Sequence, residues 1–311
     1  MGLQTKRVDA GTIQYTNLPL ELKAALQWLD QLGVAYSKTR FDDYNKTLET
    51  VEAGRFAGIN LYALSEKLNA FAPLFEANEL VTIHQGLAGK GLDTFLLPKL
   101  HELVSGPKSY VDEKPQSGSS HARNTGFELS VIAHLARAGL TIEQDGGLAD
   151  VVARLGEATV IVECKRTQSE TGLEHAISDA RDQLVERYKK RKRSGLTTGL
   201  IALDLTKIFN PNLSVAKDEP DRTMMARIGD DMDSLTERYR RVWDRVRNKR
   251  TAGVLYRYGE VAWSESHRTI SWNYKYAVTP ITCGSSARVE IIRLIQKALD
   301  RLALSEGIPL D

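Results

Sequence analysis

Residues 139–166 read GLTIEQDGGLADVVARLGEATVIVECKR, and this stretch decides the fold class that we expect for the chain. It holds three short apolar runs separated by glycine-containing turns, at 140–144, 149–155 and 159–165. Side chains alternate between the two faces of a strand. Glu163 and Lys165 therefore emerge together on one face at the end of the third run, and Cys164 points the other way as a small core residue. The pattern predicts three strands, the last of which ends in a carboxylate and an amine.

A two-residue turn at Gly156 and Glu157 would pair the second strand with the third as a hairpin. In that register Asp150 lies opposite Glu163, and directly opposed Cβ atoms are about 5 Å apart. Two carboxylates at such a separation repel each other unless a cation lies between them. Mg²⁺ prefers oxygen ligands and often takes only one or two carboxylates together with a substrate phosphate. The Lys165 ammonium on the same face can orient a water or stabilise charge on a phosphorane-like transition state, as metal-assisted hydrolysis requires.

Glu128 is a third candidate carboxylate, on a helix that we expect from about Asn124 to Ala138. Thr125 and Glu128 have the spacing of a capping box, in which the glutamate would only satisfy the start of the helix. Apolar residues follow Glu128 at three, four and seven positions, so it lies at the end of an apolar stripe. The stripe favours a carboxylate that points toward the sheet, although the capping interpretation stays open.

These residues resemble the PD-(D/E)XK nuclease superfamily, which has the restriction-endonuclease-like fold. The resemblance covers about residues 120–205. It rests on the segment 123–128 at the start of a helix, on Asp150 at the start of the second strand, and on the segment 163–166 that ends the third. The proline that names the motif is replaced by Ala149, which is a common departure.

The resemblance implies a role for each residue of this pattern. Asp150 and Glu163 would ligate Mg²⁺ with the backbone carbonyl of Cys164, and Mn²⁺ would substitute for Mg²⁺. Lys165 would activate or position the attacking water, and Glu128 would complete the site. The expected activity is that of a metal-dependent endonuclease.

Two further residues are candidates for flanking the site. Some members of the superfamily carry a helical glutamine followed four residues later by a tyrosine, whereas Gln183 and Tyr188 are five residues apart here. Tyr188 therefore reads as a core residue, and Gln183 stays a candidate for contact with the site. Arg166, which directly follows the predicted catalytic lysine, is the second flanking candidate.

The surrounding pattern indicates an α/β fold, with a restriction-endonuclease-like mixed sheet flanked by helices. After the hairpin we expect the following elements: a helix at 173–191, a strand at 198–205, a polar loop at 210–231, a basic helix at 233–249, strands at 253–258 and 270–277, and a helix at 286–304. Asp204 ends one of these strands and reads as a turn residue, and His134 reads as a packed histidine.

The N-terminal third reads as mainly α-helical and carries no catalytic pattern. Its expected helical stretches are 17–33, 48–75 and 92–104. The polar segment 105–122 contains two prolines, two glycines and five serines and is the best linker candidate. We therefore predict a helical domain over residues 1–110, for sensing, interaction or nucleic-acid contact. A nuclease-like domain with a C-terminal extension follows over residues 120–311.

Composition limits the class of protein. The 311 residues are 42% hydrophobic and 26% charged, which is typical of a globular chain and excludes a mostly disordered, collagen-like or coiled-coil protein. Two cysteines cannot build a disulfide framework, so we expect a reducing, cytoplasmic setting. No apolar run approaches the roughly 18 residues of a membrane span, and the N-terminus lacks the apolar core of a secretory signal.

The formal net charge is only +2, but positive charge is concentrated in two segments. Residues 181–193 and 237–250 each hold seven basic and two acidic side chains. Such clusters can bind the phosphates of a nucleic-acid backbone. Alternatively, they are helix faces that are exposed to solvent and have no binding role. The predicted backbone contacts are Lys189, Lys190, Arg191, Lys192, Arg193, Arg240, Arg241 and Arg245. Binding through them would weaken steeply with salt.

The sequence thus favours a Mg²⁺-dependent nuclease with DNA as the expected substrate, in defence against foreign DNA or in DNA repair. A catalytically inactive nucleic-acid-binding or scaffold module of the same fold is the alternative. A homodimer, which would supply one site for each strand, and a regulatory partner bound through the N-terminal domain both stay open. No membrane association is expected.

Overall fold

The computed structural model describes most of the chain: residues 6–7, 11–14, 17–108, 110, 113, 120–144, 149–190, 195–217, 221–246, 248–264, 269–281 and 286–305. Its strands are β1 (Lys6–Arg7), β2 (Gly11–Gln14), β3 (Thr141–Ile142), β4 (Val151–Leu155), β5 (Ala158–Arg166), β6 (Thr197–Asp204), β7 (Ala216–Lys217), β8 (Thr251–Ser264) and β9 (Thr269–Pro280). Its α-helices are α1 (Leu18–Gln31), α2 (Arg40–Phe56), α3 (Leu61–Lys67), α4 (Phe71–Leu87), α5 (Asp93–Val104), α6 (His121–Arg137), α7 (Leu173–Lys190), α8 (Thr206–Phe209), α9 (Asp221–Arg238), α10 (Arg240–Val246) and α11 (Ser286–Ser305).

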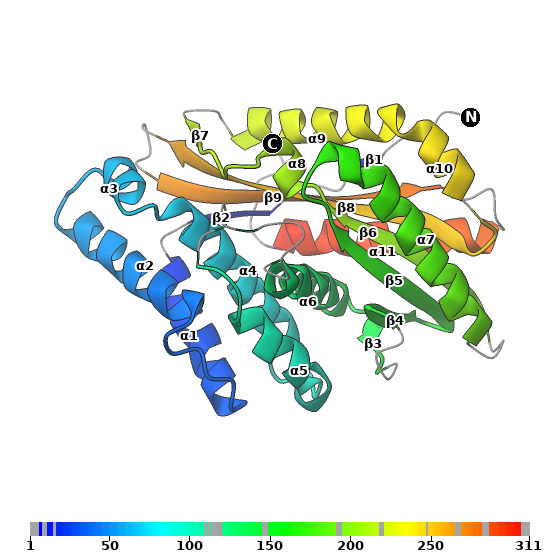
Figure 1. Cartoon of the computed structure of the whole chain (residues 1–311), viewed down its shortest axis with the longest axis horizontal. Helices are drawn as coiled ribbons and strands as arrows, with labels where there is room; N and C mark the ends of the chain where they lie inside the picture. Colours follow the sequence, from blue (N-terminus) through cyan, green and yellow to red (C-terminus); the bar gives the residue numbers. More distant parts are fainter. Residues whose placement is uncertain are drawn as a thin grey trace.

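One mixed sheet organises these elements (Figure 1). Its strand order is β1-β9-β8-β6-β5-β4-β3, with β2 also paired to β9 and β7 to β8. The pairs β5–β6, β6–β8 and β7–β8 are parallel and the others are antiparallel. Helices α7, α9 and α10 pack on one face, and α4, α6 and α11 pack on the other. The α/β class predicted from the sequence is confirmed.

The predicted hairpin of β4 and β5 is present in the predicted register. Leu155 pairs with Ala158 and Val151 with Val162, across a turn in which Gly156 has a positive φ of 57°. Such a φ suits glycine because it has no Cβ. The strand begins at Val151, so Asp150 directly precedes β4 and is not one of its paired residues.

Alternating side chains of β5 enter two separate hydrophobic clusters. Val160, Val162 and Cys164 belong to the cluster that contains α4, α6 and α11. Ile161 belongs to the cluster of α7, α9 and α10. Glu163 and Lys165 share the parity of Ile161, so the alternation expected from the sequence is confirmed, and Cys164 is a buried core residue.

Helix α6 starts earlier than expected, and this corrects the capping-box interpretation. The helix begins at His121 with Ser120 as its N-cap, so Thr125 already lies inside it. The Thr125 hydroxyl instead donates to Oε2 of Glu102 on α5 at 2.9 Å. Glu128 is therefore not needed to satisfy the start of α6 and is available for another role.

The polar loop predicted for 210–231 is wrong, because α9 begins at Asp221. Met224, Ile228, Met232 and Leu235 are all buried at helical spacing against the sheet. This apolar stripe is narrow within a mostly polar sequence, and it becomes a helix by packing on β8 and β9. The expected basic helix is divided between the end of α9 and the short α10.

The N-terminal end of the chain contributes strands as well as helices. Gly11 pairs with Tyr274 and Gln14 with Ser271, so β2 continues the sheet beyond the long β8–β9 hairpin. Pairing covers the free edge that β9 would otherwise present. The sequence alone did not indicate these strands, because their hydrogen-bond partners lie some 260 residues away along the chain.

Helices α1–α5 share a hydrophobic cluster with α6 and with the sheet. Helices α4 and α6 approach each other closely, and a Cβ built on Gly86 would lie 2.6 Å from the Cβ of Ala133. Only glycine permits this distance between the two helices. The division into domains over residues 1–110 and 120–311 stays a prediction. None of the helices in the described ranges is both long and apolar enough to cross a lipid bilayer.

Candidate functional site

Three carboxylates converge near the end of β5. Glu163 lies on β5, Asp150 directly precedes β4, and Glu128 extends from the middle of α6. Oδ2 of Asp150 accepts a hydrogen bond from the backbone N–H of Cys164 at 2.7 Å. This hydrogen bond holds the Asp150 carboxylate against the backbone of the residue that follows Glu163, whereas the predicted pairing of Asp150 with Glu163 is not among the paired positions of the hairpin.

The electrostatics of these groups reflect their mutual proximity. Burial raises the pKa of Glu163 to about 8, and the Asp150 carboxylate adds to this increase, while Arg187 and Lys165 oppose it. Burial also raises the pKa of Glu128, again with a contribution from Asp150. The Asp150 carboxylate thus makes ionisation of both Glu163 and Glu128 less favourable, as expected where acidic groups are close together.

Two cations of the chain already face these carboxylates, and neither was predicted from the sequence. Nε of Arg187 on α7 donates to Oε1 of Glu163 at 3.1 Å. Nζ of Lys99 on α5 forms an ion pair with Oε2 of Glu128. Arg187 belongs to a basic segment that was already visible, whereas nothing in the sequence around Lys99 indicates a site. Lys99 comes from the N-terminal helices, so the site is not confined to the predicted nuclease-like domain.

Lys165 and Cys164 occupy the positions expected of them. Lys165 is half-buried, and within the described ranges its ammonium forms no ion pair. The Cys164 side chain is buried on the other face, where desolvation raises the pKa of its thiol. A neutral buried thiol is a poor nucleophile and a poor metal ligand, so any contribution of Cys164 comes from its backbone.

The donor chemistry of the site fits Mg²⁺, although the structure does not show a closed ligand set. Over the described ranges, no three His, Cys, Asp or Glu side chains are grouped as metal ligands. Mg²⁺ does not need such a group, because one or two carboxylates and a substrate phosphate suffice. The Asp150 and Glu163 carboxylates would supply hard oxygen donors, and a nearby positive charge opposes the increase in the pKa of Glu163, as Arg187 and Lys165 already do.

The structure separates the two residues predicted to flank the site. Gln183 lies on α7 one turn before Arg187, and its buried amide oxygen finds no hydrogen-bond partner among the described residues. Arg166 has the opposite parity to Glu163 on β5, and its guanidinium enters a different buried cluster. Arg166 is therefore a structural residue on the α6 side of the sheet.

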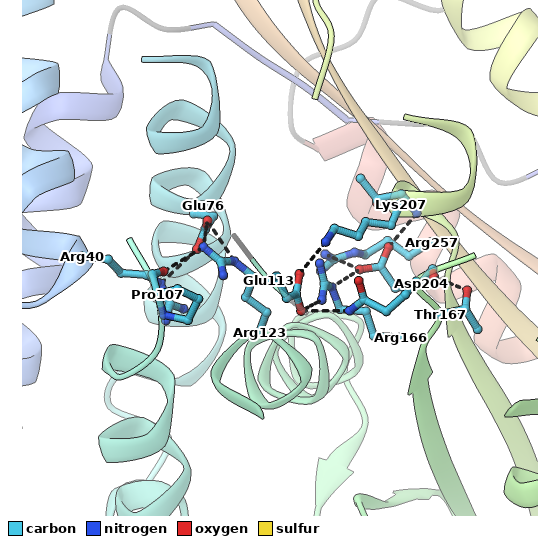
Figure 2. A network of polar contacts seen from close by, with 12 residues as sticks. Arg40, Glu76, Pro107, Glu113, Arg123, Arg166, Thr167, Asp204, Lys207 and Arg257 are labelled. Carbon is cyan, nitrogen blue, oxygen red and sulfur yellow. Dashed lines mark hydrogen bonds and ion pairs between the residues drawn. The ribbon is translucent and has the colours of Figure 1, made fainter. Parts of the chain in front are cut away.

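This second cluster is a network of buried ion pairs (Figure 2). Arg257 on β8 pairs with Asp204 at 3.1 Å and with Glu79 of α4. Arg166 pairs with Glu113 and lies 3.5 Å from Asp204. The network connects the N-terminal helices to the centre of the sheet. Oδ1 of Asp204 also accepts from the N–H of Thr206, which confirms the turn role predicted for this aspartate.

Several predicted backbone-binding residues pair with glutamates on the surface, namely Lys189 with Glu186, Arg240 with Glu237 and Arg245 with Glu174. Lys190 and Arg241 are exposed on the same helices. Arg191, Lys192 and Arg193 lie outside the described residues. Exposed ion pairs are weak and exchange readily, so these residues stay candidates for contact with a nucleic-acid backbone.

His134 is a packed histidine, as the sequence predicted, and it makes the fold sensitive to acid. Its Nδ1 lies 2.8 Å from the carbonyl oxygen of Ser130, and its ring packs on Tyr276. Burial lowers the pKa of His134 to about 3, and Arg137 and Arg257 add to this effect. The unfolded chain takes up a proton below about pH 6.5, whereas the folded chain does not until about pH 3.

His134 is therefore expected to remove about 2 kcal/mol of stability as the pH falls from 7 to 5. Glu163, whose pKa is raised to about 8, acts in the opposite direction over the same range. Urea denaturation of the wild type and of His134→Gln at the two pH values isolates the His134 contribution, which should disappear in the variant. A change between pH 7 and pH 5 that is the same in both proteins would contradict the prediction.

Comparisons with protein-family models, with curated proteins and with solved structures found no match to this chain. Function is therefore inferred from the geometry of the site alone.

Proposed function

We propose that the chain is a Mg²⁺-dependent nuclease that hydrolyses phosphodiester bonds, with DNA as the expected substrate. The observation that carries the proposal lies at the end of the β4–β5 hairpin, where the Asp150 carboxylate accepts a hydrogen bond from the N–H of Cys164, the residue after Glu163. Glu128 and Lys165 lie within Coulombic reach of Glu163 in the same region.

The order of elements supports a restriction-endonuclease-like core. The resemblance requires a helix that carries Glu128, a hairpin that starts at Asp150, and a strand that ends in Glu163 and Lys165. The chain supplies these as α6, β4 and β5, followed by α7 and the parallel strand β6. Each required residue type thus comes from the required element.

The side chains suggest how hydrolysis would proceed. Asp150, Glu163 and the backbone carbonyl of Cys164 would hold the metal ion. Bound Mg²⁺ supplies charge that polarises the phosphate and favours ionisation of a water. Lys165 would orient the attacking water and stabilise negative charge as it develops on the phosphate oxygens. Arg187 would keep Glu163 oriented, since its guanidinium bonds one carboxylate oxygen.

A cleavage assay tests this proposal directly. We expect purified protein to nick or linearise plasmid DNA in buffer with Mg²⁺ or Mn²⁺ and to leave it intact in EDTA, because the carboxylates alone cannot neutralise a phosphodiester. RNA and single-stranded DNA belong in the same panel, since the site geometry does not discriminate between them. Cleavage that is unchanged by EDTA, or no cleavage of any of these substrates, would contradict the proposal.

One observation favours the alternative of a non-cleaving nucleic-acid-binding or scaffold module. Glu163 and Glu128 are each neutralised by a cation of the chain, Arg187 and Lys99. A site balanced in this way can persist without metal. Calorimetric titration with Mg²⁺ and Mn²⁺ separates the two functions, because a non-cleaving module would show no binding heat that depends on Asp150.

We propose that the nuclease acts in defence against foreign DNA or in DNA repair.

A further inference from the structure

Lys99 on α5 brings a cation from the N-terminal helices to the carboxylate site. Its Nζ forms an ion pair with Oε2 of Glu128, and the two side chains retain only 27% and 18% of their exposure. The pair joins α5 to α6, two helices that pack against each other. An ammonium is thus held against a carboxylate that the resemblance assigns to the nuclease site.

The Lys99 ammonium also interacts with a second carboxylate of the site. Burial lowers the pKa of Lys99, but the charges of Glu128 and then Asp150 outweigh this effect and raise it overall. Lys165, in contrast, interacts with Glu163. Lys99 therefore interacts with both Glu128 and Asp150, and its ion pair is with Glu128.

We propose that the Lys99 ammonium competes with a metal ion for the Glu128 carboxylate. A divalent cation can bind Glu128 only when the Lys99 ammonium has moved away from it. The inference rests on the proposed function, because it takes the carboxylates to be a metal site. Two cations bound to one partly buried carboxylate repel each other strongly. Their repulsion is screened much less there than in bulk water. Movement of α5 relative to α6 would then adjust metal affinity.

Mn²⁺ binding to the full chain tests the proposal without any measurement of cleavage. The signal of free Mn²⁺ in electron paramagnetic resonance reports binding to the wild type, Lys99→Met and Lys99→Arg. Lys99→Met keeps the length of the side chain and removes its charge, so its affinity is expected to rise by about tenfold or more. Lys99→Arg keeps the charge and should bind Mn²⁺ as the wild type does.

Lys23→Met is the control, because Lys23 of α1 also forms an ion pair between helices, with Glu49 of α2 at 3.0 Å, and this more exposed pair involves none of the site carboxylates. It should leave Mn²⁺ affinity unchanged. Adding Glu128→Gln to Lys99→Met should abolish the gain. Thermal unfolding of each variant shows whether the fold is retained. If Lys99→Met unfolds, Lys99→Arg still tests the inference, because it should bind Mn²⁺ with the affinity of the wild type.

Three results would overturn the inference: unchanged or weaker Mn²⁺ binding by Lys99→Met, an equal gain in Lys23→Met, or no Mn²⁺ binding by any variant. The first two results leave the proposed nuclease activity to the EDTA comparison, whereas no Mn²⁺ binding by any variant would contradict both this inference and the proposed function. Conversely, a Glu128-dependent gain in Lys99→Met would stand even if no substrate were cleaved.

Discussion

Replacement of Lys165 by alanine is expected to slow plasmid cleavage in Mg²⁺ by about 10²–10⁴-fold, the usual contribution of a positioned acid–base group. Lys165 lies at the end of β5 on the same face as Glu163, and its ammonium forms no ion pair with the described residues. It is therefore available to a water or a phosphate oxygen. The carboxylates remain in place in this variant, so metal binding should persist.

Single-turnover cleavage of supercoiled plasmid with excess protein measures the effect on the chemical step. Binding of the same DNA, followed separately in Ca²⁺, should change little, because the basic helix surfaces are untouched. Lys46→Ala is the matched control, since Lys46 is an exposed lysine on α2 that pairs only with Asp42 at 2.8 Å. Equal cleavage by the wild type and Lys165→Ala would remove the nuclease proposal.

Replacement of Arg257 by methionine is expected to lower the free energy of unfolding by about 3–5 kcal/mol, the typical cost of leaving buried charges without a partner. Arg257 is 3% exposed and donates to Asp204 and to Glu79. Methionine fills a similar volume but supplies no charge, so both carboxylates lose a partner. A loss of this size is a large fraction of the roughly 5–15 kcal/mol by which folded domains are usually stable.

Equilibrium urea denaturation measures this loss. Adding Glu79→Gln to Arg257→Met removes one of the stranded carboxylates and should recover part of the stability. Arg245→Met is the control on the surface, where the ion pair with Glu174 is exposed and is worth about 0–1 kcal/mol. A loss below about 1 kcal/mol in Arg257→Met would show that the network contributes little.

Local sequence was sufficient to predict the centre of the fold. The hairpin of β4 and β5, its turn at Gly156 and its register all follow from period-two alternation and turn chemistry, which depend on neighbours in sequence. The same alternation placed Glu163 and Lys165 on one face and Cys164 on the other. Asp150 lies just before the first paired residue of β4, and a hydrogen bond from the Cys164 N–H holds its carboxylate at the end of β5.

Other features depended on contacts between distant parts of the chain. The narrow apolar stripe of α9 and the short strands β1 and β2 are stabilised by packing or pairing with β8 and β9, so their own sequences carry little signal. The capping interpretation of Thr125 failed because a side chain of α5 supplies its partner. The outcome in each case was set by a partner that local propensity does not describe.

The sequence by itself determined which residues could do the chemistry: two carboxylates and a lysine at the end of a hairpin, with a third carboxylate on the preceding helix. Only the tertiary structure decided which cations face them, because Lys99 and Arg187 arrive on separate helices. The structure also shows that Arg166 lies in a buried network with Glu113 and Asp204, and not at the predicted site. The physical reason is range: alternation and turns act over a few residues, whereas charge and packing act between whatever groups the fold brings together.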